Sequence, residues 1–400
     1  MDRDNKIRKL MKAPSYIWHI LLFFILWIPA RLFRKMSGRY RNLWLVSERG
    51  NDARDNGYWF FRYLREKHPE INARYVISRD SPDFGNAAEL GETVIFRSFR
   101  HRLMYLAADY LVSAHVQPAA PDMVIYYHLA QIGIRAKGKQ VFLQHGIIKD
   151  DMEWLHYPKL RVDMFVSGAL PEFEYLKKTY GHPDGVIRFL GLCRFDSLVE
   201  DGEKTREILV MPTWRGAFYP HGDDFPKTMF YRSFQALLSD PKTSELLDRL
   251  DFRLIFYPHA ELQDELRHFT SPSERIILAR REDYDVHDLL KRCRILITDY
   301  SSVFFDVAYM NKPVIYYQFD EDEFRSYHYK QGYFSYERDG FGPVVRTHDE
   351  LMKALCAAAD NGFESEELYR SRAASFFGSR EGGCCERTYA EILKLGKGGQ

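Results

Sequence analysis

Short apolar runs alternate with helical patterns along nearly the whole chain, and this alternation limits the folds that it can adopt. Strands and helices in this rhythm form βαβ units, whose strands pair in parallel within one sheet. We expect strands at residues 42–47, 73–77, 93–95, 110–113, 140–144, 164–167 and 187–190, and again at residues 208–212, 252–256, 276–278, 295–298 and 313–317. The clearest helical patterns lie at residues 56–67, 228–238 and 302–310. The sequence therefore predicts the α/β class, with parallel, doubly wound sheets.

The chain is too long for a single core. At 400 residues it exceeds the length at which one hydrophobic core stops growing. The segment EDGEKT at residues 200–205 separates the two series of strands and is typical of a linker. We expect an N-terminal segment at residues 1–41, a first domain at residues 42–203 and a second domain at residues 204–390. Two doubly wound domains in series predict a cleft, with ligands at the C-terminal ends of the strands.

The first 41 residues carry a strong positive charge. Ten basic residues against two acidic ones give this segment a net charge of +8, whereas the whole chain has a formal charge of +1. Between the basic clusters lies an apolar run, YIWHILLFFILWIPA at residues 16–30, with Trp18 and Trp27 near its ends. A membrane-spanning helix needs roughly 20 apolar residues, so this run is short. The residues after it offer no small-residue site for a signal peptidase.

Three interpretations of this segment stay open: a helix in the membrane interface, a helix across the membrane, and a buried helix of the globular body. Tryptophans near both ends and cations on both flanks favour contact with anionic lipid headgroups. We expect a membrane-associated helix that holds the protein on the cytoplasmic face of the cell membrane, as a peripheral or monotopic protein.

The overall composition argues against several functions. A balanced charge does not suit a protein that coats nucleic acid. The five cysteines form no CxxC pair and no zinc-type spacing, and their odd number argues against a disulfide framework, so a reducing cytoplasm is expected. The chain has no GxxxxGKS/T, GxGxxG or HExxH motif, which removes the usual support for an ATPase, a dinucleotide oxidoreductase or a zinc protease.

His145 follows directly on an expected strand and precedes Gly146. A histidine in this position lies at the mouth of a parallel sheet, beside a residue that lets a substrate approach the backbone. An imidazole changes its charge near neutral pH and is therefore a suitable general base for an attacking hydroxyl. A structural histidine in a loop is the alternative, and the flanking residues favour the catalytic interpretation.

Two strand ends in the second half carry basic side chains. Arg215, in PTWRG, is placed where a guanidinium can fork onto phosphate oxygens, although most arginines are simply solvated. His259, in FYPH, is presented at the same edge and could donate a hydrogen bond to a phosphate or leaving group. A structural role for His259 is equally open.

Residues 299–302 follow another strand and open a helix. Ser301 and Ser302 can be ordinary N-caps, but the same geometry aims backbone N–H groups and the helix dipole at an anion such as a diphosphate. Asp306, one turn further on, either supports this site or solubilises the surface, and the same alternatives apply to Asp320.

Arg194 and Asp196 close the first half of the chain. They could line the cleft or pair with each other across it.

Together these segments resemble the CDP-glycerol:poly(glycerophosphate) glycerophosphotransferase family, which includes teichoic-acid primases and polymerases and capsule-type alditol-phosphate transferases. The most characteristic stretch is residues 297–320, ITDYSSVFFDVAYMNKPVIYYQFD. Five further motifs agree in order and spacing: LQHGIIKDD, PTWRG, FYPH, GLCRFDSL and GYFSYERDGFGPVV. The family's N-terminal opening is similar to WLVSERGNDARDNGYWFFRYLREKHPEINARYVI. The likeness covers residues 42–390, and an ordered series of motifs is far more specific than any one of them.

The resemblance implies a GT-B-like architecture, in which two Rossmann-like domains face a cleft. It implies that His145 deprotonates the acceptor hydroxyl and that CMP leaves. The residues that it implies for binding the donor pyrophosphate are Arg215, His259, Ser301 and Ser302. We therefore expect His145 and His259 to be catalytic. The expected substrate-binding residues are Arg215, Ser301, Ser302, Asp299, Arg194 and Asp306. No metal ligand is expected, and a divalent cation is left open.

The expected reaction moves glycerol phosphate, or a related alditol phosphate, from CDP-glycerol or CDP-ribitol to a hydroxyl of a lipid-linked or polymeric glycan. Two alternatives remain: a GT-B glycosyltransferase that uses a nucleotide sugar, and a non-catalytic binding module of a polysaccharide assembly. Release of CMP indicates phosphoryl transfer, whereas release of CDP or UDP indicates glycosyl transfer. The alditol, the acceptor, the oligomeric state and the choice between primase and polymerase stay open.

Overall fold

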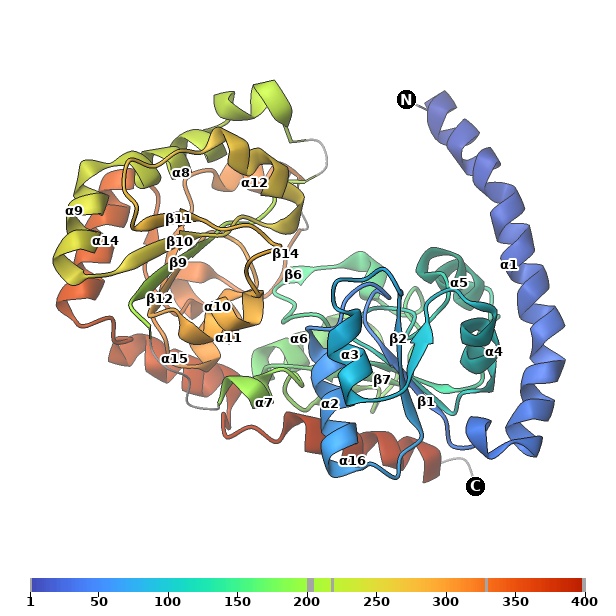
Figure 1. Cartoon of the computed structure of the whole chain (residues 1–400). Helices are drawn as coiled ribbons and strands as arrows, with labels where there is room; N and C mark the ends of the chain where they lie inside the picture. The colour runs from blue at the N-terminus through green and yellow to red at the C-terminus, as the bar shows by residue number, and fades with distance from the viewer. Residues whose placement is uncertain (1, 200–204, 217–218, 328–329, 398–400) are drawn as a thin grey trace.

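The computed structural model describes residues 2–199, 205–216, 219–327 and 330–397. Two α/β domains lie side by side, and one long N-terminal helix follows the outer flank of the first domain (Figure 1). The predicted linker at residues 200–205 lies, except for Thr205, outside the described residues. The predicted boundary at residue 203 therefore stays a prediction.

The first domain is built on a seven-stranded parallel sheet in the order β3-β2-β1-β4-β5-β7-β8. Its strands are β1 (Trp44–Ser47), β2 (Ala73–Ile77), β3 (Thr93–Ile95), β4 (Tyr110–Ser113), β5 (Lys139–Phe142), β7 (Met164–Ser167) and β8 (Ile187–Phe189). The strand order reverses between β1 and β4. In such sheets ligands bind outside the carboxyl ends of the strands at this switch point.

The second domain is built on a six-stranded parallel sheet in the order β11-β10-β9-β12-β13-β15. Its strands are β9 (Glu207–Met211), β10 (Arg253–Phe256), β11 (Ile276–Leu278), β12 (Ile295–Thr298), β13 (Val314–Tyr317) and β15 (Val344–Val345). The order reverses between β9 and β12, so this sheet also has a switch point. Two short strands, β6 (Asp150–Asp151) and β14 (Lys330–Gln331), pair with each other outside both sheets.

Helices cover both sheets. Those of the first half are α1 (Asp2–Met36), η1 (Gly38–Tyr40), α2 (Asn56–Lys67), α3 (Phe84–Leu90), α4 (Phe99–Ala107), α5 (Met123–Gln131), η2 (Glu153–Leu155), α6 (Leu170–Thr179) and α7 (Phe195–Leu198). Those of the second half are η3 (Gly222–Lys227), α8 (Met229–Ser239), α9 (Pro241–Leu250), η4 (Ala260–His268), α10 (Val286–Arg292), α11 (Phe304–Tyr309), α12 (Glu321–Tyr327), α13 (Tyr336–Asp339), α14 (His348–Asp360), α15 (Glu367–Phe377) and α16 (Cys384–Lys397). Each expected strand has a counterpart that begins and ends within two residues of its expected limits.

Helix α2 begins where the sequence predicts, and a buried carboxylate fixes its start. Glu48, just after β1, accepts hydrogen bonds from the backbone N–H groups of Asp55 at 2.7 Å and Tyr58 at 3.1 Å. These are N–H groups that a helix start leaves without an intrahelical partner. The inner face of α2 buries Phe60 and Phe61 against the sheet. Asp55 is thereby held at the N-cap, at the C-terminal edge of β1.

The C-terminal helix differs from the sequence prediction, which placed residues 204–390 in the second domain. Helix α16 crosses back to the first domain (Figure 1), where Cys385 and Ile392 are buried in the same core cluster as Trp44. Asp196 anchors the start of α16, because its carboxylate accepts from the backbone N–H groups of Cys384 at 2.7 Å and Cys385 at 2.8 Å. Helices α1 and α16 therefore both pack on the first domain.

Side chains of the two domains meet across the cleft. Arg54 donates to Asp285 at 2.7 Å, and Arg325 donates to Asp150 at 2.7 Å. The pairing of β6 with β14 adds backbone hydrogen bonds between the two halves of the chain (Figure 1). The C-terminal edges of both sheets are thus held close together.

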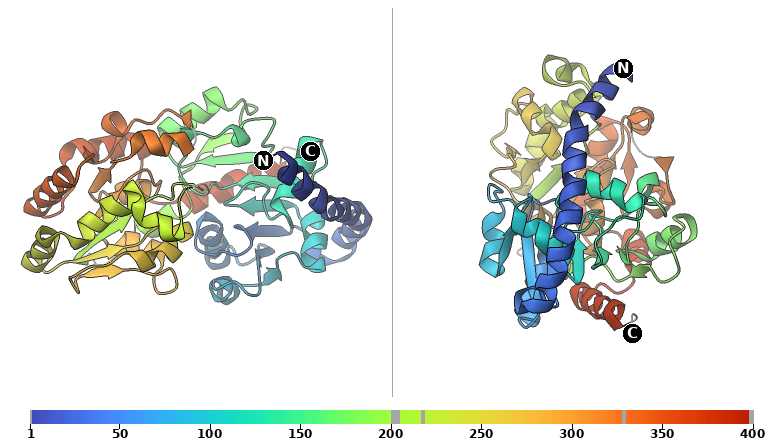
Figure 2. Two further views of the ribbon diagram at one scale, coloured as in Figure 1. Left: turned by 90° about the horizontal axis from the view of Figure 1, so that it is seen from above. Right: turned by 90° about the vertical axis from the view of Figure 1, so that its right-hand side faces the viewer.

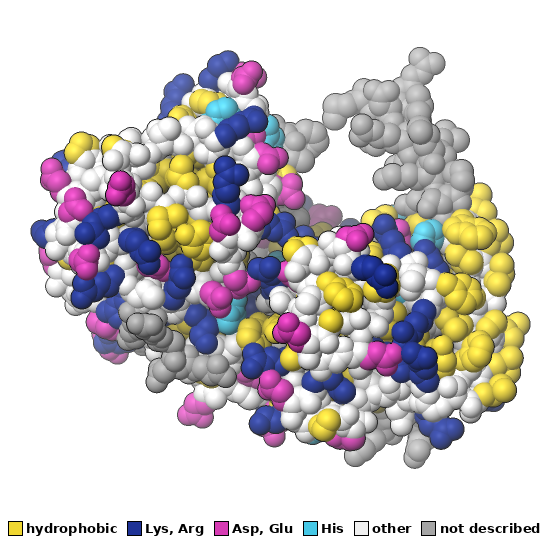
Figure 3. Space-filling view, viewed as in Figure 1, with side chains coloured by type: hydrophobic (Ala, Val, Ile, Leu, Met, Phe, Trp, Pro, Cys, Tyr) yellow, Lys and Arg dark blue, Asp and Glu magenta, His cyan; other side chains and the backbone are white. Residues whose placement is uncertain are grey.

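Helix α1 lies along the first domain, crossing its flank beside α4 and α5 (Figure 2). Its inner face buries Phe23, Leu26 and Ala30 in the same core cluster as residues of these two helices, and His19 meets Arg102 of α4 at 2.9 Å. The outer face is apolar and exposed, and it forms the yellow strip on the right flank in Figure 3. Among the described residues, the helical stretch 17–36 is long and apolar enough, by length and composition, to cross a membrane.

Candidate active site

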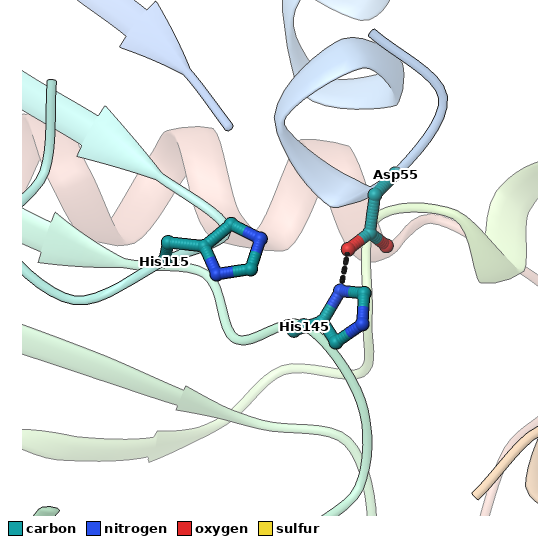
Figure 4. A group of neighbouring side chains, drawn as sticks. All are labelled: Asp55, His115 and His145. Atoms are coloured by element: carbon teal, nitrogen blue, oxygen red, sulfur yellow. Dashed lines mark hydrogen bonds and ion pairs between the residues drawn. The ribbon is translucent and has the colours of Figure 1, made fainter. Parts of the chain in front are cut away.

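His145 forms a close pair with Asp55 at the mouth of the first sheet (Figure 4). The imidazole Nδ1 lies 2.5 Å from Asp55 Oδ2, and the side chains of His145 and Asp55 are 63% and 14% exposed. A carboxylate only accepts hydrogen bonds, so Nδ1 carries the proton. In the neutral form of the ring, Nε2 then holds the lone pair on an exposed side chain, which is the arrangement that a general base requires.

Asp55 is a site residue that the sequence interpretation missed. It stands 90 positions before His145, in a motif to which no role was given. The sequence offered one signal: Asp55 stands just before helix α2, in the segment that follows β1. In the sheet, β1 lies beside β4, and β4 lies beside β5, the strand that precedes His145. Neighbouring carboxyl ends in one parallel sheet bring such residues together.

Arg194 connects this pair to the second domain. Its Nη1 donates to Asp55 Oδ1 at 2.8 Å, and its Nε and Nη2 donate to Asp306 at 2.6 and 2.9 Å. Arg194 also donates to the backbone carbonyl of His145. Burial alone would raise the pKa of Asp55, but the charges of His145 and Arg194 outweigh it and lower that pKa. Asp55 is therefore ionised when it holds the imidazole.

The predicted substrate contacts of Arg194 and Asp306 do not agree with this geometry. Their side chains are 14% and 3% exposed, and the three guanidinium nitrogens of Arg194 are all used within the protein. Nor does Arg194 pair with Asp196, whose carboxylate caps α16. In the structure Arg194 instead bridges Asp55 and Asp306.

Buried polar contacts fix the loop that carries His145. Gln144 has a positive φ of 65°, and its amide donates to Val166 O at 2.8 Å and to Glu172 at 3.0 Å. Asn56, the first residue of α2, donates to Gln144 O at 2.8 Å and accepts from the backbone N–H of Arg194 at 3.0 Å. His145 is thus presented from a rigid turn.

His115 lies against the ring of His145, with ring centroids 5.1 Å apart and an interplanar angle of 30° (Figure 4). Burial, together with the charge of His145, lowers the pKa of His115 to about 3, so its ring stays neutral. Asp55, His115 and His145 offer donor atoms within 4.8 Å of one another, a set that transition metals accept. Both oxygens of Asp55 are already bonded and Arg194 adds a positive charge beside them. A divalent metal ion at this position would have to break the hydrogen bond between His145 and Asp55.

The His145 loop meets the serine segment of the second domain. A methyl group added at Gly146 would lie 3.4 Å from Ser302 Oγ. Ser301 and Ser302 are partly exposed, and in the part of the chain described here neither hydroxyl has a hydrogen-bond partner. Helix α11 starts only at Phe304, after a turn, and is six residues long. Ser302 therefore presents its hydroxyl close to Gly146, the residue after His145, and both serine hydroxyls are available to a ligand.

Arg215 and Asp299 lie behind this surface, which the sequence interpretation did not anticipate. Both side chains are 0% exposed, and Arg215 Nη1 lies 2.7 Å from Asp299 Oδ2. Arg215 Nε also donates to Asp320 at 2.7 Å. Asp299 accepts from the N–H of Thr213 at 2.8 Å, which ties the loop after β9 to the loop after β12. Direct contact of Arg215 and Asp299 with a substrate does not agree with their burial.

His259 is exposed and parallel to the Trp214 ring, with centroids 6.1 Å apart and an interplanar angle of 11°. Its Nδ1 accepts from the backbone N–H of Glu261 at 3.2 Å, so the neutral ring carries its proton on Nε2. Partial burial of the ring lowers the pKa of His259 and favours this neutral form. His259 can therefore donate one hydrogen bond to an oxygen in the cleft.

A family model described as CDP-glycerol:poly(glycerophosphate) glycerophosphotransferase matches residues 29–394. The chain is 30% identical over 371 residues to the minor teichoic acid biosynthesis protein GgaB of Bacillus subtilis, covering 88% of this chain and 40% of GgaB. It is 23% identical over 368 residues to the teichoic acid poly(glycerol phosphate) polymerase of Staphylococcus epidermidis, covering 82% of this chain and 46% of that protein. The chain thus spans less than half the length of these relatives.

Solved structures share the fold. A structure of the wall teichoic acid polymerase TagF, a variant with CDPG, superposes with a TM-score of 0.67 at 18% identity, covering 98% of each chain. The MnaA–UDP structure of S. aureus gives a TM-score of 0.56 at 12% identity, covering 89% of this chain and 96% of that one. The predicted GT-B-like fold is confirmed.

Proposed function

The chain belongs to the CDP-glycerol:poly(glycerophosphate) glycerophosphotransferase family, and from this membership we propose that it transfers glycerol phosphate, or a related alditol phosphate, from a CDP-alditol to a glycan hydroxyl. The acceptor is a lipid-linked or polymeric cell-surface glycan, and CMP is released. The observation that carries the proposal is the His145–Asp55 pair, whose loop approaches Ser302 of the second domain at Gly146. The names of the relatives, and the TagF variant with CDPG, support the same donor class.

The reaction begins at His145. Its Nε2 takes the proton of the acceptor hydroxyl, and the oxygen attacks the β-phosphorus of the donor. The new O–P bond forms as the bond from that phosphorus to the bridging oxygen breaks, and CMP leaves with the bridging oxygen. Asp55 stabilises the imidazolium and keeps the ring in the correct tautomer, without taking the proton itself. Transfers of this kind depend mostly on positioning and charge neutralisation.

The second domain faces the donor. We assign contact with the donor phosphates to the hydroxyls of Ser301 and Ser302 and to His259 Nε2–H. Arg215 and Asp299 hold the loops that present these groups, so their role is one of positioning. No step of the proposal is assigned to a divalent cation.

Nucleotide release tests the proposal directly. The chain would be incubated with CDP-glycerol, CDP-ribitol and a panel of nucleotide sugars, together with a glycan acceptor, and the nucleotide product identified by mass spectrometry. CMP formed from a CDP-alditol supports the proposal. Formation of CDP or UDP from a nucleotide sugar would contradict the proposal and indicate glycosyl transfer. If no donor gave a product, a non-catalytic binding module would be the remaining interpretation.

Replacing Asp55 with asparagine should reduce kcat/KM for transfer by about 10²- to 10⁴-fold. The amide keeps the size of the carboxylate but cannot stabilise the imidazolium. The acidic limb of the pH profile should also shift to lower pH, because the negative charge beside the ring is lost. Steady-state kinetics from pH 5 to 9 would measure both effects.

The matched control for this variant is Asp151→Asn. Asp151 pairs with His156 at 2.7 Å in the same domain but outside the site. Equal rates and pH profiles for the two variants would remove Asp55 from the mechanism.

We further propose that the outer face of α1 lies on the cytoplasmic surface of the cell membrane. Ile25 and Ile28 are 61% and 63% exposed in the apolar strip of Figure 3. Arg31, Lys35 and Arg41 are exposed at the same end of the chain and suit anionic headgroups. The opposite face of α1 is occupied by the first domain, which favours a helix lying on the membrane over one crossing it.

Replacing Ile25 and Ile28 with aspartate should weaken binding to phosphatidylglycerol vesicles by at least about tenfold. The variant no longer gains the free energy of transferring two apolar side chains from water into the membrane. Vesicle co-sedimentation at two salt concentrations would measure this. Leu368→Asp, at a 54% exposed site on α15, is the control and should bind like the wild type. Undiminished binding of the double variant would contradict the assignment of this face.

A further inference from the structure

The cleft arginines predicted to bind phosphate are already neutralised. Arg194 pairs with Asp55 and Asp306, and Arg215 pairs with Asp299 and Asp320. Neither guanidinium is available to a substrate without breaking a buried ion pair. A donor diphosphate nevertheless brings negative charge into the site, and transferring a phosphoryl group places more charge on its oxygens. Another cation, one that is not already paired with a carboxylate, could neutralise this charge.

Arg49 stands at the correct edge of the first sheet. Ser47 of β1 is in register with Ser113 of β4, which is in register with Phe142 of β5. Arg49 follows Ser47 by two residues, as His115 follows Ser113. The three strands are neighbours, so their extensions bring Arg49, His115 and the His145 loop to the same edge.

The loop that carries Arg49 is fixed on both sides. Glu48, before it, is buried against the start of α2 and is bonded to that helix. Gly50, after it, has a positive φ of 93°, and a methyl group added there would lie 2.6 Å from the ring of Phe96. The backbone at Arg49 is thus restrained while its side chain is exposed.

Arg49 is distinguished from its neighbours by its contacts. Arg54 pairs with Asp83 and Asp285, and Arg281 approaches Asp52 at 3.9 Å. Within residues 2–199, 205–216, 219–327 and 330–397, the Arg49 guanidinium has no hydrogen bond or ion pair. It is an uncompensated charge on the cleft side of the β1 loop.

The charge of Arg49 reaches both walls of the cleft. Burial is the main cause of the lowered pKa of His115 in the first domain and of His259 in the second, and the charge of Arg49 adds to the lowering in both. A single arginine therefore lies within electrostatic range of a histidine from each domain.

We propose that Arg49 is a phosphate-binding residue of the active site, whose guanidinium forks onto oxygens of a substrate phosphate. The inference rests on the proposed function. A planar guanidinium matches two phosphate oxygens, and charge-assisted hydrogen bonds are the strong ones. Two sources share this chemistry: the diphosphate of the CDP-alditol, and a phosphodiester at the end of a polymeric acceptor.

The test compares Arg49→Ala and Arg49→Lys with wild type. Arg49→Ala should lose about 10- to 100-fold in kcat/KM, the usual effect of removing a charged hydrogen bond. Arg49→Lys should recover only part, since an ammonium lacks the fork. The control is Arg249→Ala, an exposed arginine on α9 at the far side of the second domain (Figure 1), which should behave as wild type.

Titration calorimetry with CDP separates the sources. A loss of CDP affinity in Arg49→Ala assigns the residue to the donor, whereas unchanged CDP affinity with a raised KM for acceptor assigns it to the acceptor. Unchanged affinity and unchanged KM for both substrates overturn the inference. A wild-type chain that releases no CMP from any CDP-alditol overturns the proposed function instead, and CDP affinity that still depends on Arg49 would then keep the residue as a phosphate ligand.

Discussion

Replacing His145 with alanine is expected to reduce transfer by about 10²- to 10⁴-fold, the usual contribution of a general base. In its neutral form the imidazole holds a nitrogen lone pair on an exposed ring, and Gly146 beside it lies close to Ser302. CDP affinity should change by less than about twofold, because no contact with the donor is assigned to this side chain. Single-turnover assays with CDP-glycerol and calorimetry with CDP would measure the two quantities.

The control for this variant is His68→Ala. His68 follows the C-terminal end of α2 and approaches Glu70 at 3.2 Å, so it is a histidine–carboxylate contact at the opposite end of the helix from Asp55. It should transfer at the wild-type rate. Full turnover by the His145 variant would remove the residue from the base role, and equal losses in both variants would indicate damage to α2 instead.

Replacing Arg215 with methionine should lower the unfolding free energy of the second domain by about 3–5 kcal/mol. Asp299 and Asp320 would stay buried with no cation between them. Methionine fills the space among the rings of Phe230 and Tyr300, which lie 5.0 and 5.3 Å from the guanidinium carbon, so the loss is electrostatic and not a cavity effect. Urea denaturation followed by hydrogen exchange in β9 and β12 would measure it.

Arg253→Met is the matched control. Arg253 pairs with Glu207 at 2.8 Å but is 56% exposed, and Glu207 keeps Arg292 as a second partner. Its loss should cost less than about 1 kcal/mol. A methionine variant of Arg215 with wild-type stability and much weaker CDP binding would restore the predicted role of direct ligand.

The strands were predictable because parallel, doubly covered strands are apolar along their whole length. Residues 276–278 and 314–317 are such runs, and both form strands where the sequence predicts them. The position of His145 was predictable for a related reason, because ligand-binding side chains follow the carboxyl ends of strands. These features depend on local pattern alone.

Partner choice was not predictable in the same way. The sequence places Arg215, Asp299 and Asp320 after β9, β12 and β13, and a pattern cannot tell whether an arginine there meets a ligand or a carboxylate. Opposite charges on adjacent strand ends neutralise each other when both are buried, and burial is set by the three-dimensional packing. The return of α16 to the first domain was missed because a helical pattern shows which residues are buried but not which sheet buries them.

The Arg194–Asp306 ion pair also bears on how the two domains can separate. It is bidentate and buried, so pulling it apart would leave an uncompensated charge in the protein. Arg54 and Asp285, which also join the domains, are 42% and 28% exposed and can part at little cost. We expect the two domains to rotate about a hinge at Arg194 and to open on the side of Arg54. A substrate could then enter and leave while His145 stays in place beside Asp55.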